Sequence, residues 1–197
     1  VDLKKFQYCL PKISKNKKFS CIGTILSDWF LIDWLSIFFK CIDEYDDEAI
    51  FEIISKDNEQ EIISRLNLNN SLKRKLFIRS SSSENMPDLI KEHSASAFFF
   101  RPDISKLGSS PTRCGEILAV GRPIICNSGV GDINQIISGN NIGIIVNDPN
   151  YESMLSAIKR LYIMINDPLT SKRCRNFAES YYSLDKATET YPKVYGI

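Results

Sequence analysis

SPTRCGEILAVGRPII, residues Ser110 to Ile125, contains the start and stop signals of a helix and, directly after it, a strand. Ser110 is a good N-cap, and Pro111 suits the first helical position because its missing N–H would have no intrahelical partner there. Gly121 fits a left-handed residue after the helix end, and Pro123 cannot continue the helix. These signals predict a helix of roughly two to three turns from Pro111, followed by a strand at 124–126.

The first turn of this predicted helix has the chemistry of an anion site. The N–H groups of Thr112, Arg113 and Cys114 are left without intrahelical acceptors, and the helix dipole places positive potential there. Arg113 adds a charge, and Glu116 projects on the same side of the helix. Amides and a cation would hold the phosphates of a nucleotide diphosphate, and the carboxylate would accept from ribose hydroxyls. Taken alone, the pattern favours the simpler interpretation of a well-capped core helix with a surface Arg–Glu pair.

Composition excludes several classes of protein. The 197 residues are 43% hydrophobic and 25% charged, enough for one full core, and the net charge of +1 gives no electrostatic case for nucleic acid. The apolar run at 29–39 is too short for a membrane span and contains Asp33. The six cysteines show no C-x-x-C spacing, so we expect reduced core thiols in a cytoplasmic protein. The chain begins with Val1 and shows no signal peptide, so we expect a fragment or processed product.

Strand and helix patterns alternate along the chain, which predicts a doubly wound parallel α/β sheet with ligands bound beyond the carboxyl ends of the strands. The lysine-rich residues 1–18 look like an exposed linker, with a lipid-facing basic patch at a membrane as the alternative. The only histidine, His93, is expected at the surface or as a helix cap. The predicted strands are 19–25, 50–55, 75–78, 97–100, 124–126 and 142–146, and the predicted helices are 31–42, 58–66, 86–93, 111–120, 133–137, 154–165, 168–182 and 184–195.

The stretch SPTRCGEILAVGRPII resembles the donor-site segment of the retaining glycosyltransferases of family 4, in which a strand and loop lead to a helix that bears a glutamate and then a Gly–basic–Pro turn. Other segments are similar to that family in the same order. They are VDLKKF (1–6), IGTILSDWF (22–30), NSGVGDINQII (127–137), NNIGIIV (140–146) and SLDKATETYPKVY (183–195). The resemblance covers essentially the whole chain.

The resemblance implies the C-terminal, Rossmann-like half of a GT-B enzyme, which transfers a sugar from a nucleotide diphosphate sugar to an acceptor hydroxyl with retention. It divides the chain into a linker (1–18), a nucleotide-sugar-binding domain (19–182) and a C-terminal helix (183–197). A glycan or lipid-linked acceptor would be bound by a missing N-terminal domain, so this fragment is expected to bind donor without transferring it. The resemblance identifies no catalytic residue. The donor-binding residues it implies are Gly23, Thr24, Ser81, Met86, Arg101, Ser110, Thr112, Arg113, Cys114 and Glu116.

The roles differ among these residues. Glu116 matches the second glutamate of the family's E-x7-E motif and would bind the ribose. Residues around Ser81 and Met86 would approach the base. The diphosphate would be lined by Thr112, Arg113 and Cys114 together with Gly23 and Thr24. The first glutamate of the motif falls on Gly108. The usual basic pair after the first strand is replaced by Ser27, Asp28 and Trp29, so Arg113, Lys106 or Arg101 must supply the positive charge, and Arg113 is our choice.

No D-x-D follows a strand, so we expect neither a divalent metal nor any cofactor besides the nucleotide sugar. Other hypotheses remain beside the transferase. A nicotinamide-dependent enzyme would need G-x-G-x-x-G after the first strand, which IGTILSDW lacks. A sugar-nucleotide epimerase of related architecture stays open. So does a degenerate, non-catalytic nucleotide-sugar-binding or scaffold domain, which Gly108 and the missing basic pair make plausible.

Overall fold

The structure is a computed structural model that describes residues 1–11, 15–106, 108 and 111–195; it does not describe the side chains of 106 and 191–195. Six parallel strands form one sheet in the order β3-β2-β1-β4-β5-β6. The order reverses between β1 and β4, which is the switch point of a doubly wound Rossmann-like fold. The strands are β1 (Lys18–Ile22), β2 (Ile50–Ile54), β3 (Leu76–Arg79), β4 (Ala95–Phe98), β5 (Ile124–Asn127) and β6 (Gly143–Val146).

Helices connect the strands as the sequence predicts, with two short additions: the 3-10 helix η1 and helix α3, which Asn69 caps by accepting from the amide of Leu72. The predicted helix 168–182 is an α-helix only to Phe177 and continues as a π-helical turn, η2. The helices are α1 (Ile32–Tyr45), α2 (Glu59–Leu66), α3 (Asn70–Lys75), α4 (Met86–Glu92), η1 (Ile104–Lys106), α5 (Thr112–Val120), α6 (Ile133–Asn140), α7 (Tyr151–Asn166), α8 (Pro168–Phe177), η2 (Ala178–Tyr182) and α9 (Leu184–Tyr195).

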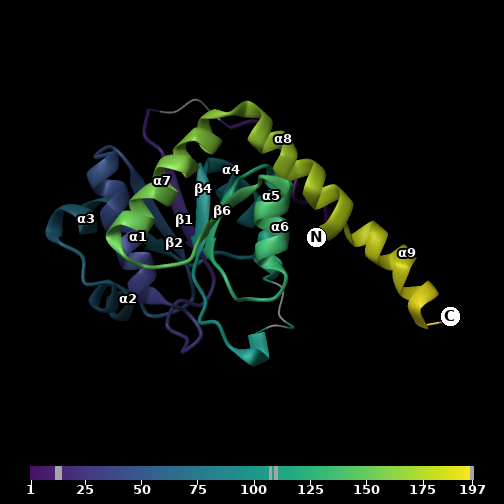
Figure 1. The fold of residues 1–197 in the computed structure, drawn as a ribbon, viewed down its shortest axis with the longest axis horizontal. Coiled ribbons are helices and arrows are strands. Elements are labelled where there is room, and N and C mark those ends of the chain that lie inside the picture. The colour runs from purple at the N-terminus through teal and green to yellow at the C-terminus, as the bar shows by residue number, and fades with distance from the viewer. Residues whose placement is uncertain (12–14, 107, 109–110, 196–197) are drawn as a thin grey trace.

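Two helical layers cover the sheet (Figure 1). Helices α1, α2 and α7 pack together on one face, and α4, α5 and α8 pack together on the other. An aromatic cluster fills the first interface: Phe19 of β1 contacts Phe38 of α1 edge to face, with ring centroids 6.0 Å apart, and Tyr162 of α7 at 5.6 Å. Helix α9 extends away from this body at the C-terminal end of the chain (Figure 1). The predicted fold class is therefore confirmed.

Several predicted boundaries differ from the structure by one to three residues, including the end of α1 at Tyr45 rather than residue 42 and the start of α7 at Tyr151 rather than residue 154. β1 ends at Ile22 rather than residue 25, because Gly23 has a φ of +134° and cannot continue a strand. β4 begins and ends two residues earlier than predicted. Helix α5 begins at Thr112 rather than Pro111: Pro111 has a ψ of 108° and occupies the cap position itself. The expected cap, Ser110, lies outside the described residues.

The side chain of His93 does not lie where the sequence predicts. His93 does follow the end of α4, but its side chain is buried rather than at the surface. Its Nε2 lies 2.6 Å from a carboxylate oxygen of Glu52, which is itself buried on β2. Arg79 contacts the other oxygen of Glu52 at 2.7 Å. The lone histidine thus forms a buried pair with Glu52, and the half-exposed Arg79 contacts the same carboxylate.

Residues 1–10 are attached to the domain rather than wholly exposed. The side chain of Phe6 is buried, and its carbonyl accepts from Arg175 at 2.8 Å. The fully buried guanidinium of Arg122 donates to the carbonyl of Cys9 at 2.7 Å and to that of Lys91 at 2.8 Å. These bonds fix the N-terminal segment against the turn after α5, while Lys4 and Lys5 remain exposed.

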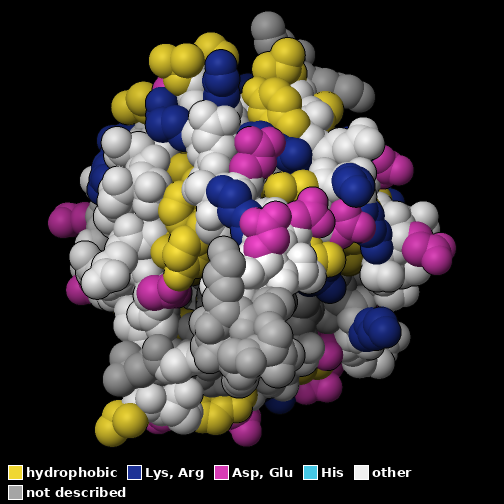
Figure 2. All heavy atoms as spheres, turned by 90° about the vertical axis from the view of Figure 1, so that its right-hand side faces the viewer, with side chains coloured by type: hydrophobic (Ala, Val, Ile, Leu, Met, Phe, Trp, Pro, Cys, Tyr) yellow, Lys and Arg dark blue, Asp and Glu magenta, His cyan; other side chains and the backbone are white. Residues whose placement is uncertain are grey.

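The cysteines are mostly core thiols, as the sequence predicts, and charges of both signs are mixed on the surface face that Figure 2 shows. All six cysteines are free thiols, and all but Cys9 are buried. Acidic and basic side chains are interspersed, with hydrophobic ones between them, on the face from which α9 projects (Figure 2). Among the described residues, no helix has the length and apolar character that a membrane crossing requires.

Candidate functional site

A pocket of about 330 Å³ lies at the carboxyl edge of the sheet, beside the switch point between β1 and β4. Ligands of doubly wound sheets bind in such crevices. The pocket is bounded by the loop after β1, the end of β4 and the first turn of α5. Its described lining residues are Ile22, Gly23, Thr24, Ser27, Trp29, Phe30, Phe98, Phe100, Pro111, Thr112, Arg113 and Val130.

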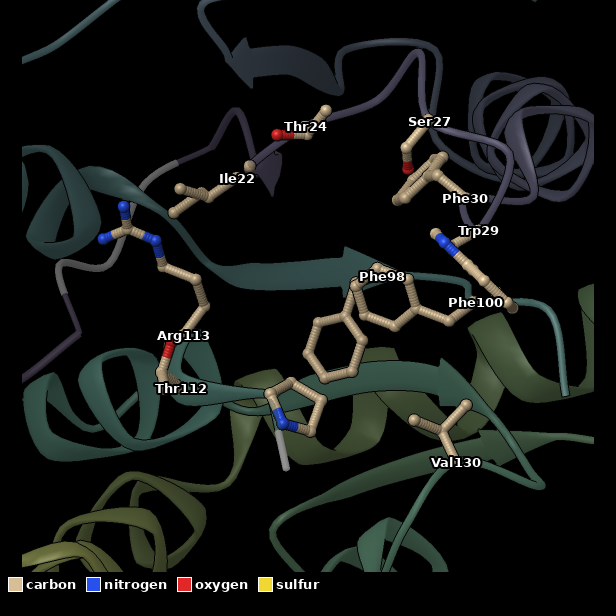
Figure 3. Close-up of a pocket in the computed structure, with 12 residues that line it drawn as sticks. Ile22, Thr24, Ser27, Trp29, Phe30, Phe98, Phe100, Thr112, Arg113 and Val130 are labelled. Atoms are coloured by element: carbon tan, nitrogen blue, oxygen red, sulfur yellow. The ribbon is translucent and has the colours of Figure 1, made fainter. Parts of the chain in front are cut away.

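One end of the pocket is polar. Arg113 and Thr112, from the first turn of α5, lie on the opposite side of the view from the aromatic residues (Figure 3). The amides of these two residues begin the helix, where no intrahelical acceptor exists. The amide of Cys114 differs from the prediction, because it donates to the carbonyl of Pro111 at 3.0 Å. The thiol of Cys114 is fully buried, and burial raises its pKa well above the usual value.

Glu116 is linked to the pocket by its ion pair with Arg113. The Arg113 guanidinium donates to the Glu116 carboxylate one helical turn further on, so the two project on the same side of α5 as predicted. Glu116 itself is absent from the described lining of the pocket. Because the Arg113 side chain is 38% exposed, solvent screens this ion pair, which is worth about 0–1 kcal/mol. A phosphate could therefore compete for Arg113 at small cost.

The loop after β1 is anchored from behind by Asp57. Its carboxylate accepts from the amides of Ile25 at 2.5 Å and Leu26 at 2.9 Å. Partial burial would raise the pKa of Asp57, but the bonds from these amides and from Ser55 outweigh burial and hold the pKa below its usual value. The anchor leaves Thr24 at the pocket. A Cβ added to Gly23 would meet no atom within 4 Å, as expected beside an open cavity.

The other end of the pocket is aromatic. Phe98 and Phe100 are two residues apart at the end of β4, and their ring centroids lie 5.6 Å apart. Phe30 contacts Phe100 edge to face at 5.8 Å, and the two residues also form an isolated antiparallel bridge. Trp29 and Val130 complete this end (Figure 3). The site therefore combines a cation and hydroxyls near a helix start with a rigid apolar wall.

Solved structures with a similar fold were found at low sequence identity. The chain is similar to TarM (14% identity, TM-score 0.69, 98% of this chain and 37% of that one), a mutant of which, from S. aureus, was solved with UDP, fondaparinux and alpha-GlcNAc-glycerol. It is also similar to Anabaena HepE in complex with UDP and glucose (11%, 0.71, 100% and 55%). A third match is the C-terminal domain of LpcC, a group 1 glycosyltransferase from Francisella tularensis (13%, 0.64, 93% and 99%).

The fold is that of GT-B glycosyltransferase domains. The chain spans between a third and about half of the length of TarM and HepE, whereas it matches nearly all of the LpcC domain. No protein-family model matches the sequence, and no curated protein matches it in sequence. The likeness consequently establishes a glycosyltransferase fold, and residue roles must be argued from the geometry of this chain.

The GT-B fold brings some of the predicted site residues together and separates others. Gly23, Thr24, Thr112 and Arg113 line the pocket. The five remaining described candidates do not belong to its lining. Met86 and Cys114 are buried in the core, Ser81 lies in the loop after β3, Arg101 is exposed and Glu116 pairs with Arg113. Ser110 lies outside the described residues. Within the part of the chain that the structure describes, no cluster of His, Cys, Asp or Glu could hold a metal ion.

Sequence reasoning missed the aromatic wall. The run AFFF at 97–100 is typical of a strand covered on both faces, and β4 is buried throughout, but the strand ends at Phe98. Phe99 packs against Trp34 and Phe38. Phe98 and Phe100 lie on the opposite side, at the pocket. Their period-two spacing at the predicted carboxyl end of a strand was the available signal.

Proposed function

We propose that this chain is the donor-binding domain of a glycosyltransferase that takes a nucleotide diphosphate sugar and transfers the sugar, with retention, to an acceptor hydroxyl. The observation that carries the proposal is the placement of Arg113 and the start of α5 at one end of a pocket beside the sheet's switch point. The UDP bound in the structurally similar HepE and in the TarM mutant supports it. The acceptor, a glycan or a lipid-linked sugar, is bound by an N-terminal domain.

The chemistry follows from the charges. As the sugar–phosphate bond breaks, negative charge grows on the leaving diphosphate, and preorganised donors stabilise it without reorganising. The amides of Thr112 and Arg113 and the Arg113 guanidinium supply this stabilisation. Glu116, freed from Arg113 when a phosphate takes its place, accepts from ribose hydroxyls. The described pocket lining contains no carboxylate that could hold a divalent cation, so donor binding is expected to be independent of metal.

A second candidate is a degenerate domain that binds nucleotide sugars without turning them over. Gly108 favours it, since it stands where the resembling family has a glutamate and offers no side chain to a sugar. The two candidates share the binding step and differ only in turnover by the complete protein. Product analysis of the complete protein with its donor would separate them.

Calorimetric titration of the 197-residue chain with UDP, GDP and ADP, with and without EDTA, tests the binding step. We expect at least one of these nucleotides to bind more tightly than millimolar, and equally well in EDTA. Failure of all three to bind above background at millimolar concentration would refute the donor-site assignment. Binding that EDTA abolishes would instead refute the metal-independent mechanism.

A further inference from the structure

The β4–β5 ladder stops at the pocket, although the two chains continue side by side. Phe98 pairs with Cys126, and the next residue of β5, Asn127, turns its side chain toward Phe100. Asn127 is 3% exposed. Its Oδ1 accepts from the Phe100 amide at 2.8 Å, and its Nδ2 donates to the carbonyls of Phe100 at 2.7 Å and Ser128 at 2.9 Å. A carboxamide presents the same donor and acceptor as a peptide group, so it replaces one rung of the ladder.

The opposite edge of the same segment holds the loop after β1. The carbonyl of Phe99 accepts from the Leu31 amide at 2.9 Å, and the amide of Arg101 donates to the Trp29 carbonyl at 2.8 Å. Successive residues of an extended chain direct their polar groups to opposite sides. Residues 99–101 are therefore held between the Asn127 side chain and residues 29–31 of the loop.

We propose that Asn127 is a positioning residue for the pocket: it fixes the Phe100 backbone and, through it, the Phe30–Trp29 side of the aromatic wall. Asn127 does not line the pocket itself. Three other residue types of different chemistry would not supply its three bonds. Aspartate lacks the N–H donors and would face two carbonyl oxygens, serine is too short, and leucine would leave the Phe100 amide and carbonyl unpaired. In its consequence for donor affinity, the inference rests on the proposed function.

Hydrogen exchange measured by NMR on the 197-residue chain tests directly whether Asn127 fixes the Phe100 backbone. In Asn127→Ala, the amides of Phe100, Leu31 and Arg101 should exchange about tenfold faster or more, because their shared support is lost. Asn150→Ala is the matched control: Asn150 caps α7 by accepting from Ser153 and lies away from the pocket. Unchanged exchange at these three amides in Asn127→Ala would overturn the proposal.

The second readout is UDP affinity, measured together with unfolding free energy in urea. Asn127→Ala should weaken UDP binding by about five- to tenfold, whereas Asn150→Ala, though also destabilised, should bind UDP as the wild type does. Equal affinity of Asn127→Ala and wild type would overturn the positioning role and leave the proposed function intact. Absence of nucleotide binding by the wild type would refute the proposed function, and the exchange comparison would then decide on Asn127 alone.

If Asn127→Ala does not fold, the wild-type chain still provides a test. The two protons on Nδ2 of Asn127 should exchange slowly with solvent, since both are bonded to backbone carbonyls in a buried setting. Rapid exchange of these protons, like that of exposed asparagines, would overturn the positioning role of Asn127.

Discussion

Replacing Arg113 with alanine should weaken the binding of UDP by roughly 2- to 150-fold and leave the binding of uridine unchanged. A guanidinium bonded to a phosphate contributes about 1.5–3 kcal/mol, well below the roughly 4 kcal/mol of two unit charges at 4 Å in a dielectric of 20, because the side chain is 38% exposed. Breaking the existing pair with Glu116 costs about 0–1 kcal/mol of this gain. The net loss of about 0.5–3 kcal/mol corresponds to a rise of roughly 2- to 150-fold in the dissociation constant.

The assay is calorimetry for UDP and ligand-observed NMR for uridine, with both ligands titrated at low and at high salt. Arg65→Ala is the matched control, because Arg65 forms an exposed intrahelical pair with Glu61 on α2, away from the pocket. It removes the same charge and should leave both affinities unchanged. An equal loss of UDP and uridine affinity in Arg113→Ala would remove Arg113 from the phosphate role. So would equal losses of UDP affinity in the two arginine variants.

Three further predictions concern the fold. Burial lowers the pKa of His93, and the pKa of Glu52 is also lowered, because the hydrogen bond from His93 and the nearby positive charges outweigh its burial. The unfolded state therefore binds more protons, and the unfolding free energy measured in urea should fall as the pH drops below about 6.5, and fall further below about 4.5. A flat profile from about pH 7 to 4 would be the contrary result. Gly143→Ala should lower the midpoint of thermal unfolding, since the added Cβ would overlap a backbone carbonyl of β5. Gly139→Ala, in open space on α6, should instead raise the unfolding free energy by about 0.5–1 kcal/mol. A more stable Gly143→Ala than Gly139→Ala would contradict this packing. A thiol reagent should modify only Cys9 quickly in the native chain and all six cysteines in denaturant, because the other five thiols are buried, and rapid native reaction at a second site would show the core to be open.

Local signals in the sequence were sufficient for the succession of strands and helices. Gly121, with a φ of +89°, ends α5 where the sequence predicts, and Asn58 caps α2 by accepting from Glu61. Such signals act within a few residues, so they are readable without knowledge of the fold. The alternation of elements then restricts the topology, which is why the parallel sheet and its ligand-binding edge were predictable.

Part of the candidate site was predictable for the same reason. The pairing of Arg113 with Glu116 depends only on helical spacing, and the position of Arg113 at the ligand-binding edge follows from the helix start that precedes β5. The error of one residue at the helix start arose because Pro111 has an extended ψ of 108° and occupies the cap position instead of the first helical position.

The remaining features depend on contacts between segments far apart in the chain. Asn127 meets Phe100, Asp57 meets the loop after β1, and His93 meets Glu52 only because parallel strands gather distant residues at one edge or on one face of the sheet. A buried polar side chain is determined by the partner that satisfies it, and the sequence alone does not name that partner. The sequence thus determined the elements and the charge at the helix start, whereas the tertiary structure decided the walls of the pocket, because those walls are held by hydrogen bonds that exist only after the sheet has formed.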